Sequence, residues 1–374
     1  MGPRVAVFVS LAFAGSAWLS AVVGSKSHAV VAYGPTALSI SVGIILFWTV
    51  IALANDAHRV RVALAAWCAA SAMLTALAAV VYLVPSVARL PFLSAGHASV
   101  AVNGVSYLRI YSPLGDYELF AEMAAIAAVA AMSRLVDSRG NRRIGWAAIL
   151  VLATIGAIST GTRGGVVILA LGMALLWLAR RGTVARSRMA AFFALLLAVG
   201  VAFVFVLPVF RGIAARFASI RLSSSLSTDI NRQGLWSQFL PHIGLTKEFF
   251  LGFGTNFDQS AWPTLPHSLY VYLLNTQGVI GLSLMCVLMA VLAYPFLKTL
   301  FGRHSWTVAS LLGLMVLLFA VDEVKVEFLR IYNYQLVVWS LLGIAVAAQR
   351  VCSAQPHAYP SHAAPPTTAE NLSR

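Results

Sequence analysis

Long runs of apolar residues recur along the chain, and short segments that are charged or rich in glycine and proline separate them. Most runs approach the length of about 20 residues that an α-helix needs to cross the hydrocarbon core of a bilayer. The pattern therefore predicts about ten membrane-spanning helices. The predicted spans are residues 4–23, 30–53, 62–88, 117–136, 144–160, 164–179, 189–208, 278–297, 305–321 and 333–349.

The fold class that this pattern predicts is an all-α, polytopic transmembrane bundle. Because lipid offers no partner to free backbone N–H and C=O groups, only helices and closed β-barrels span membranes. A barrel would show short segments in which apolar and polar residues alternate, unlike the unbroken runs of this chain. The composition agrees, since 60% of the residues are hydrophobic and 10% are charged, whereas a soluble domain has roughly 25% charged residues.

The pattern divides the chain into four regions. Residues 1–208 are predicted to hold the first seven transmembrane helices, and residues 278–349 the last three. Residues 209–277 form a large outer loop, in which we expect short helices and the active site, because a loop of about 70 residues is rarely without a role. Residues 350–374 are rich in proline, alanine, serine and threonine, which predicts a disordered tail.

The distribution of lysine and arginine over the short loops predicts the orientation in the membrane, since cytoplasmic loops carry an excess of both. If the most basic loops are cytoplasmic, both termini are cytoplasmic too. The net charge of +14 is spread over such loops, so we expect no nucleic-acid partner, and the three cysteines have neither disulfide nor zinc spacing. The basic loops contain Arg59, Arg61, Arg139, Arg142, Arg143, Arg180, Arg181, Arg186, Arg188, Lys298 and Arg303.

Arginine also accumulates on the predicted outer side, against this bias. Cations gathered there could attract an anionic substrate, so we expect the chemistry of the protein on the outer face. Four of these arginines lie in the long loop. The outer set is Arg89, Arg109, Arg163, Arg211, Arg216, Arg221, Arg232 and Arg330.

The first candidate site is the turn Thr162-Arg163-Gly164-Gly165, between the fifth and sixth predicted spans. The glycines leave room beside the arginine, and the next helix begins there with free N–H groups and the positive end of its dipole. This combination predicts an anion site. The alternative is an interfacial arginine that extends toward water from a tight turn.

The second candidate lies in the long loop, from Arg232 through Trp236 to Gly252-Phe-Gly254. Arg232 could bind phosphate, and Trp236 could stack on a sugar or an isoprenoid chain. The Gly-x-Gly is a weak signal, because no strand precedes it as a nucleotide-binding fingerprint requires. The alternative is an amphipathic helix that lies on the membrane surface.

The third candidate is His267, in the segment Pro266-His267-Ser268-Leu-Tyr270. Thr264 could cap a short outer helix and place His267 in its first turn. A helix N-terminus disfavours the imidazolium form, so the ring would be neutral near pH 7, as a general base must be. The alternative is a histidine with a structural role.

Acidic residues gather before the last predicted span, at Asp322, Glu323 and Glu327. Paired carboxylates could bind a divalent metal or act as acid and base. Lys325 and Arg330 lie among them, which favours a local cluster of salt bridges instead. Outer arginines could similarly be neutralised by acidic residues near the start of the fourth span, namely Asp116, Glu118 and Glu122.

In content and order, these motifs resemble those of the O-antigen ligase and polymerase superfamily of bacterial membrane glycosyltransferases. The Thr-Arg163-Gly-Gly turn comes first, Arg232 and the Gly-Phe-Gly follow in a large outer loop, and His267-Ser-Leu-Tyr precedes Gln-Gly-Val-Ile-Gly281. The segment from Arg109 to Asp116 also looks like a family feature. The resemblance covers roughly residues 105–285, and it departs from the family pattern where Thr162 replaces a common serine and Ser268 a common asparagine.

The resemblance implies a GT-C-like, metal-independent and inverting glycosyltransferase of the bacterial inner membrane, acting without a cofactor. The donor would be a glycan on undecaprenyl diphosphate at the periplasmic face, and the acceptor a hydroxyl of lipid A–core, as in lipopolysaccharide O-antigen synthesis. His267 would activate that hydroxyl. The expected diphosphate-binding residues are Arg163, Arg232, Arg109 and Arg211, and the expected substrate contacts are Trp236 and Tyr270.

Two alternatives remain open. A polysaccharide polymerase would use the same arginines and base, but would transfer the glycan to a second lipid-linked repeat unit. A non-enzymatic transporter of lipid or polysaccharide would need ionisable residues near the middle of the bilayer. The predicted spans contain few such residues apart from Glu118, Glu122 and Arg134, which argues against ion-coupled transport.

Overall fold

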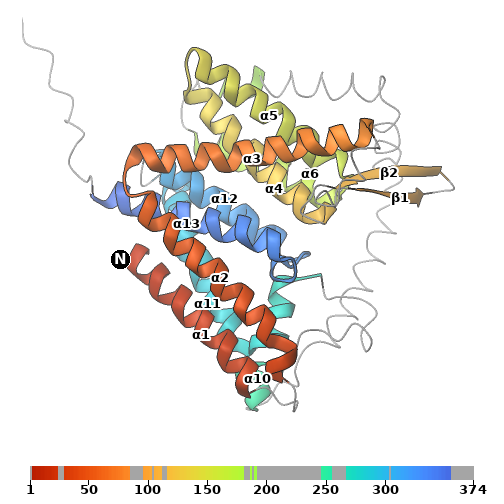
Figure 1. The fold of residues 1–374 in the computed structure, drawn as a ribbon. Coiled ribbons are helices and arrows are strands. Elements are labelled where there is room, and N and C mark those ends of the chain that lie inside the picture. Colours follow the sequence, from red (N-terminus) through yellow and green to blue (C-terminus); the bar gives the residue numbers. More distant parts are fainter. Residues whose placement is uncertain are drawn as a thin grey trace, which may run out of the picture.

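The computed structural model describes residues 2–23, 29–84, 96–102, 105–111, 116–180, 186–187, 189–191, 246–254, 267–302 and 305–354 (Figure 1). The helices are α1 (Gly2–Val23), α2 (Ala29–Leu53), α3 (Ala57–Leu83), α4 (Tyr117–Asp137), α5 (Asn141–Ser159), α6 (Arg163–Ala179), α10 (Lys247–Leu251), α11 (Leu269–Leu300), α12 (Val308–Asp322), the 3-10 helix η2 (Phe328–Arg330) and α13 (Tyr332–Ala354). The strands are β1 (Gly96–Val102) and β2 (Val105–Tyr111).

The helices confirm the predicted polytopic transmembrane bundle. Seven of the described helices are long and apolar enough to cross a membrane, namely α1 to α5, α11 and α13. Helices α6 and α12 are apolar but shorter. Of the predicted spans, the one at 189–208 lies outside the described residues from residue 192 onward. The chain is thus a multi-pass membrane protein.

A β-hairpin between α3 and α4 departs from the all-α expectation. Strands β1 and β2 pair antiparallel, from Gly96 opposite Tyr111 to Val102 opposite Val105. The hairpin falls in a stretch that the hydrophobic pattern assigned to no span. Valine, tyrosine and isoleucine favour strands, because they suit a pleated surface, and β2 is rich in them.

Helix α4 is the innermost helix. Every side chain from Leu119 to Ser133 is buried, and α3, α5, α6 and α12 pack around it. Alanine supplies much of this surface, and small side chains let helix backbones approach closely in a membrane. At Gly165 of α6, an added Cβ would come within 2.8 Å of the Ala121 Cβ, so this close approach requires glycine.

A second group, formed by α1, α2, α11 and α13, lies beside the helices around α4 (Figure 1). Its centre is Trp339 of α13, which is fully buried. The Trp339 ring lies 6.1 Å from the rings of Phe13 and Phe47 and 6.3 Å from that of Phe328, measured between centroids. A Cβ added at Gly43 would overlap the indole, so Gly43 makes the room for it.

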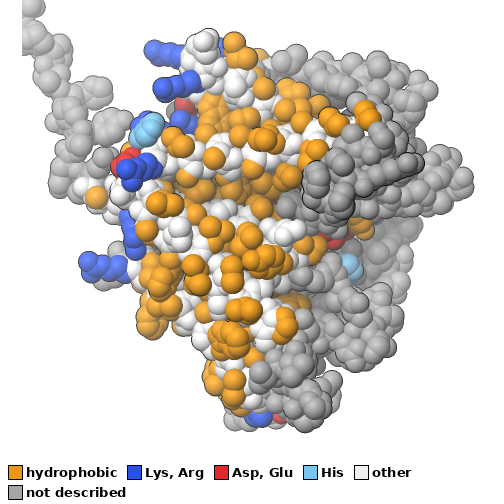
Figure 2. Space-filling view, viewed as in Figure 1, with side chains coloured by type: hydrophobic (Ala, Val, Ile, Leu, Met, Phe, Trp, Pro, Cys, Tyr) orange, Lys and Arg blue, Asp and Glu red, His pale blue; other side chains and the backbone are white. Residues whose placement is uncertain are grey.

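Basic side chains gather along one edge of the bundle, and a band of apolar side chains covers the face beside it (Figure 2). Helix α1 begins and α13 ends at this edge, and the turns between α2 and α3 and between α4 and α5 lie there too (Figure 1). The opposite end carries the β-hairpin, the turn between α5 and α6, and the starts of α11 and α13. This is the separation of loops that the distribution of lysine and arginine predicted.

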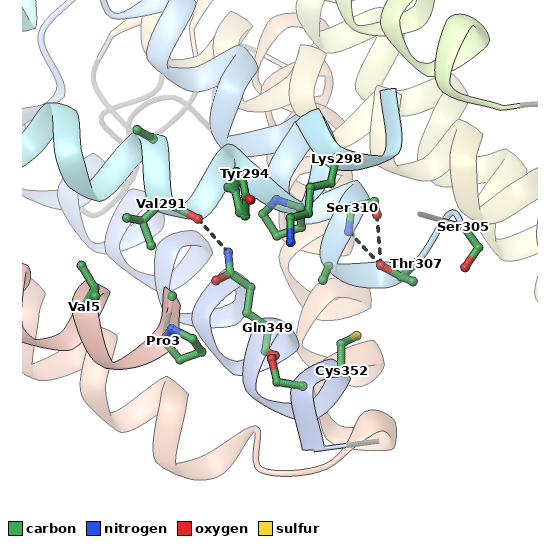
Figure 3. Close-up of a pocket in the computed structure, with 15 residues that line it drawn as sticks. Pro3, Val5, Val291, Tyr294, Lys298, Ser305, Thr307, Ser310, Gln349 and Cys352 are labelled. Atoms are coloured by element: carbon green, nitrogen blue, oxygen red, sulfur yellow. Dashed lines mark hydrogen bonds between the residues drawn. The ribbon is translucent and has the colours of Figure 1, made fainter. Parts of the chain in front are cut away.

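At the basic edge, a side chain of α13 compensates for a proline in α11. Pro295 has no N–H group, so it cannot donate the helical hydrogen bond to the Val291 carbonyl. Gln349 Nε2 donates to that carbonyl instead, over 3.2 Å (Figure 3). It also donates to the Leu292 carbonyl over 3.2 Å. Gln349 thereby satisfies a polar group that lipid would leave unpaired, at one side of a groove of about 810 Å³.

Candidate functional site

The turn that contains Arg163 is built as the sequence predicted. Gly161 has a φ of +62°, and the Oγ1 atoms of Thr160 and Thr162 lie 2.9 Å apart in a hydrogen bond that closes the turn. Thr162 is the N-cap of α6, but its side chain makes no capping bond, and Arg163 is exposed. The start of α6 therefore combines a cationic side chain with uncapped N–H groups and the positive end of the helix dipole.

A second cation lies against this turn. A Cβ added at Gly164 would occupy the position of the Lys325 ammonium group, so the Lys325 side chain crosses the backbone beside Arg163. Lys325 Nζ also pairs with Asp322 Oδ1 at 2.8 Å, and the Lys325 side chain is 30% exposed. The glycine that the sequence suggested as room for a ligand is thus room for a lysine, which brings an ammonium group, paired with Asp322, to the start of α6.

His267 lies next to the segment that carries Lys325. The Leu269 N–H, two residues after His267, donates to the carbonyls of Glu323 and Val326 over 2.9 Å each. The prediction that His267 lies in the first turn of a helix is wrong, because Ser268 is the N-cap of α11 and His267 precedes it. His267 has a φ of +46°, a left-handed conformation that is uncommon outside glycine and concentrates at functional sites.

Tyr270 ties α11 to α12. Its hydroxyl donates to the Ala320 carbonyl over 2.5 Å, and the residue is partly buried. The bond fixes the first turn of α11 against the C-terminal part of α12, one turn before the segment that holds Lys325. The contact of Tyr270 with a substrate remains a prediction.

Four carboxyl groups are buried behind these cations, at Glu122, Asp322, Glu323 and Glu327. The predicted salt-bridge cluster is confirmed at Asp322, which pairs with Lys325. Glu323 Oε2 accepts a hydrogen bond from the Phe328 N–H over 3.2 Å. Burial raises the pKa of Glu323 well above its usual range, and the neighbouring Glu122 adds to this increase. Among the described residues, no group of three or more metal-binding side chains could hold a metal ion.

Glu122 is the buried residue whose setting the sequence analysis missed. We expected it to neutralise outer arginines near the start of its span. Instead, its Oε2 accepts a hydrogen bond from the Tyr334 hydroxyl over 2.8 Å, which joins the central helix α4 to α13. A glutamate within an apolar run is itself the signal that could have found this site, because such residues in membrane spans are costly and usually functional.

The Gly252-Phe-Gly254 and Gln277-Gly278 motifs dock against each other. The N–H groups of Phe253 and Gly254 donate to carbonyls in the first part of α11, at residues 275 and 276, over 2.7 and 3.2 Å. Gly252 and Gly278 have φ values of +71° and +66°, and a Cβ on either would collide with the other segment's backbone. The two motifs therefore form a structural joint, not a nucleotide-binding loop.

Helix α1 holds this joint from the other side. Ser16 Oγ donates to Gln277 Oε1 over 2.9 Å, and Ser20 Oγ donates to the Leu251 carbonyl over 2.6 Å. Because Gly278 interrupts the helical geometry, α11 consists of a short segment next to His267 and a long membrane-spanning segment. The joint thus fixes the short segment that begins beside His267.

Three predicted site residues lie outside the described residues: Arg211, Arg232 and Trp236. Arg109 lies in β2, where its backbone pairs with Ala98. The structure thus places Lys325 between the turn of Arg163 and the segment that accepts hydrogen bonds from the start of α11.

A comparison with solved structures gives a likeness, whereas the comparisons of sequence give none. No protein-family model matches the chain, and no curated protein matches it. The chain is similar to a chain in a solved structure described as "Structural coordination of polymerization and crosslinking by a peptidoglycan synthase complex". The match covers 92% of this chain and 96% of that chain, with a TM-score of 0.44 and 18% sequence identity. Values this low do not say what this chain does.

Proposed function

We propose that the protein is an O-antigen ligase-like membrane glycosyltransferase. It transfers a glycan from undecaprenyl diphosphate to a hydroxyl acceptor such as lipid A–core. The observation that carries the proposal is the meeting of Arg163, Lys325 and the His267 segment, through the contact of Lys325 with Gly164 and the hydrogen bonds of Leu269. Two cations, an uncapped helix start and a histidine are the groups that such a transfer needs.

In the proposed reaction, the diphosphate of the donor binds beside Arg163 and Lys325. The acceptor oxygen attacks the anomeric carbon as the bond to the diphosphate breaks, and the configuration at that carbon inverts. Arg163 stabilises the negative charge that develops on the leaving oxygen, because a guanidinium group binds phosphate oxygens through paired hydrogen bonds. His267 accepts the proton of the acceptor hydroxyl. The donor bond supplies the energy, so no nucleotide is required.

The proposed membrane is the bacterial inner membrane, with the Arg163 end facing the periplasm. Both termini are then cytoplasmic, in agreement with the positive-inside rule. Arg109, Arg211 and Arg232 are further proposed ligands of the diphosphate, and Trp236 and Tyr270 are proposed contacts of the glycan or the lipid. The apolar spans would hold the polyprenyl chain.

The proposal is tested by transfer in vitro with purified protein and an undecaprenyl-diphosphate-linked glycan, offered with lipid A–core. We expect Arg163→Ala to reduce kcat by roughly 100- to 1000-fold, as for the loss of one preorganised contact to developing charge. We expect His267→Ala to lose transfer as well. Arg139→Ala is the matched control and should keep normal activity. Arg139 is also an exposed arginine, but it lies just after the C-terminal end of α4, away from the Arg163 turn.

Thermal unfolding of each variant separates a catalytic defect from misfolding. Full activity of His267→Ala would remove His267 as the base. Inhibition by a chelator would favour a metal at Asp322 and Glu323 over the metal-independent reaction. Equal losses in Arg163→Ala and Arg139→Ala would contradict a diphosphate site at the start of α6.

The alternative acceptor is a second lipid-linked repeat unit, which would make the protein a polymerase. Both reactions use the same donor and the same proposed residues. Offering each acceptor separately in the transfer assay distinguishes them, since a ligase forms one product with lipid A–core and a polymerase forms a ladder of longer glycans.

One observation keeps a non-enzymatic transporter as a second candidate. The scarcity of ionisable residues in the predicted spans argued against ion-coupled transport. Glu122 is nevertheless wholly buried between α4 and α13. Movement of labelled lipid-linked glycan across proteoliposomes that lack any acceptor would support transport. Loss of that movement in Glu122→Gln, with normal folding, would assign it to this carboxyl.

A further inference from the structure

A groove at the basic edge, far from the site proposed above, has the composition of a phosphate site. It measures about 530 Å³ and lies where α3 and α5 begin and α4 ends. Helix α4 contributes Arg134 from its last turn, between the side chains of the other two helices. The lining residues are His58, Arg61, Val62, Ala65, Arg134, Arg142, Gly145, Trp146 and Ile149.

The groove concentrates positive charge without a carboxylate in its lining. Arg61, Arg134 and Arg142 reach it from three different helices. Two acidic residues at this edge form ion pairs with other arginines: Asp56 pairs with Arg59 at 3.3 Å, and Asp137, whose charge also acts on Arg134, pairs with Arg180 at 2.7 Å. Among the described residues, no carboxylate forms an ion pair with any of the three lining arginines.

The start of helix α5 adds to the positive potential. Helix α5 begins at the groove, and its N-cap, Gly140, has no side chain to satisfy the first N–H groups. Arg142 lies in that first turn, so the uncapped N–H groups and the guanidinium group lie together. A helix start of this kind favours an anion, and a guanidinium group binds phosphate through two parallel hydrogen bonds.

The other lining residues are apolar and suited to lipid. The Arg134 guanidinium carbon lies 6.0 Å from the Trp146 ring centroid, and tryptophan favours the boundary between hydrocarbon and headgroups. Val62, which lines the groove, is 52% exposed, and Ile144, which precedes the lining residue Gly145, is 70% exposed. Apolar surface therefore continues outward from the groove. The groove belongs to the edge at which lysine and arginine gather (Figure 2).

We propose that this groove binds an anionic phospholipid. Its phosphate lies among Arg61, Arg134 and Arg142, and its acyl chains lie along the apolar faces of α3 and α5. Basic pockets between transmembrane helices on the cytoplasmic side bind such headgroups in other membrane proteins. A soluble phosphate would use the arginines but leave the apolar surface beside them uncovered, which favours the lipid. This inference does not depend on the proposed glycosyl transfer.

The test measures lipid retained by the purified full-length protein, by native mass spectrometry after exchange into micelles that contain phosphatidylglycerol or phosphatidylcholine. The groove variant is Arg61→Gln/Arg142→Gln, since both side chains are exposed and their loss should not disturb folding. The control is Arg59→Gln/Arg139→Gln, which removes the same charge from the start of α3 and from the turn before α5, outside the lining of the groove. We expect the groove variant to bind phosphatidylglycerol about tenfold more weakly than the control does.

Equal weakening in both double variants would overturn the proposal, because it would indicate attraction to the basic surface in general. Equal binding of phosphatidylcholine and phosphatidylglycerol by the native protein would overturn it too. Inorganic phosphate is the third arm: if it displaced phosphatidylglycerol completely at equal concentration, the ligand would be soluble phosphate. Should the double variant unfold in phosphatidylcholine, Arg142→Gln compared with Arg139→Gln gives the same test.

Discussion

Glu323 is a carboxyl group in a place that water does not reach. It is fully buried, close to Glu122 and Asp322, and its described hydrogen-bond donor is the Phe328 N–H. Burial disfavours the charged carboxylate and so raises the pKa of Glu323 above that of an unfolded chain. The folded protein therefore holds this proton more tightly than the unfolded protein does.

The sign of the pH effect follows from linkage. The pKa of Glu323 is higher in the folded protein than in the unfolded chain. The favourable contribution of Glu323 to the stability of the fold is therefore fully present below the unfolded pKa of about 4.3, and it is lost as pH rises through the folded pKa. Glu323→Gln should therefore raise the thermal unfolding temperature at pH 8, by about 2 °C or more, and by less at pH 5. Scans of the purified protein at the two pH values measure this difference.

The control for this pH effect is Glu248→Gln, which removes a partly exposed carboxyl from α10. Its effect on the unfolding temperature at the two pH values gives the reference for removing a carboxyl that is not fully buried. A Glu323→Gln variant that was less stable than the native protein at pH 8 would mean that the fold stabilises the charged carboxylate, contrary to our expectation.

The hydrophobic run of α11 predicted only part of this helix. The run predicted a span from residue 278, and the helical geometry of α11 is interrupted at that residue, Gly278. Helical structure nevertheless starts at Leu269, with Ser268 at the N-cap position and α10 docked on the segment before Gly278. The run could not reveal this first segment, since partners from α1 and α10 hold it in place.

Pro295 and Gln349 are predicted to be energetically coupled. Gln349→Leu should lower the stability of the native protein by about 1–2 kcal/mol, because it leaves the Val291 carbonyl without its donor. In a Pro295→Ala background the backbone N–H of residue 295 can donate to that carbonyl, so the same substitution should cost less. A double-mutant cycle, measured by unfolding in mixed micelles, should give a coupling of about 1 kcal/mol.

Additive effects of the two substitutions would contradict this account. They would mean that Gln349 stabilises α11 through the Leu292 carbonyl or through packing, and not through the carbonyl that the proline leaves free.

The molecule as a whole has two chemically different ends. One end carries the basic loops and the proposed phospholipid groove (Figure 2), and the other carries the turn of Arg163 before α6 (Figure 1), where Lys325 lies against Gly164 and pairs with Asp322. The positive-inside rule predicts that the basic end faces the cytoplasm. The proposed transfer requires the same orientation, because its donor is presented at the outer face.

Cysteine labelling tests the orientation. Cys352 is exposed at the end of α13, and Lys247 is exposed at the start of α10, near the opposite end. In a Cys286→Ser background, Cys352 should react with a membrane-impermeant maleimide in inverted vesicles but not in spheroplasts. A cysteine introduced by Lys247→Cys in a Cys286→Ser/Cys352→Ser background should show the reverse pattern. Labelling of Cys352 in spheroplasts would place the C-terminus outside and contradict the proposed orientation.

The sequence by itself determined the solvent, the class and the approximate spans of this protein. Sixty per cent of the residues are hydrophobic and lie in long runs, which indicates that lipid surrounds most of the chain. Segments of this length and composition that cross lipid must be helical, because their backbone groups find partners only within the helix. These conclusions need only local information, because a span is defined by its own length and polarity. The start of α6 at Arg163 was predictable for the same reason, from a glycine-rich turn before an apolar run.

Only the tertiary structure decided which residues share a site. Three features join distant parts of the chain. They are the contact of Lys325 with Gly164, the hydrogen bond between Glu122 and Tyr334, and the groove lined by one arginine each from α3, α4 and α5. The β-hairpin and the backbone of His267 also depended on their surroundings. Spacing along a sequence carries no record of such pairs, because the packing of helices against one another determines them.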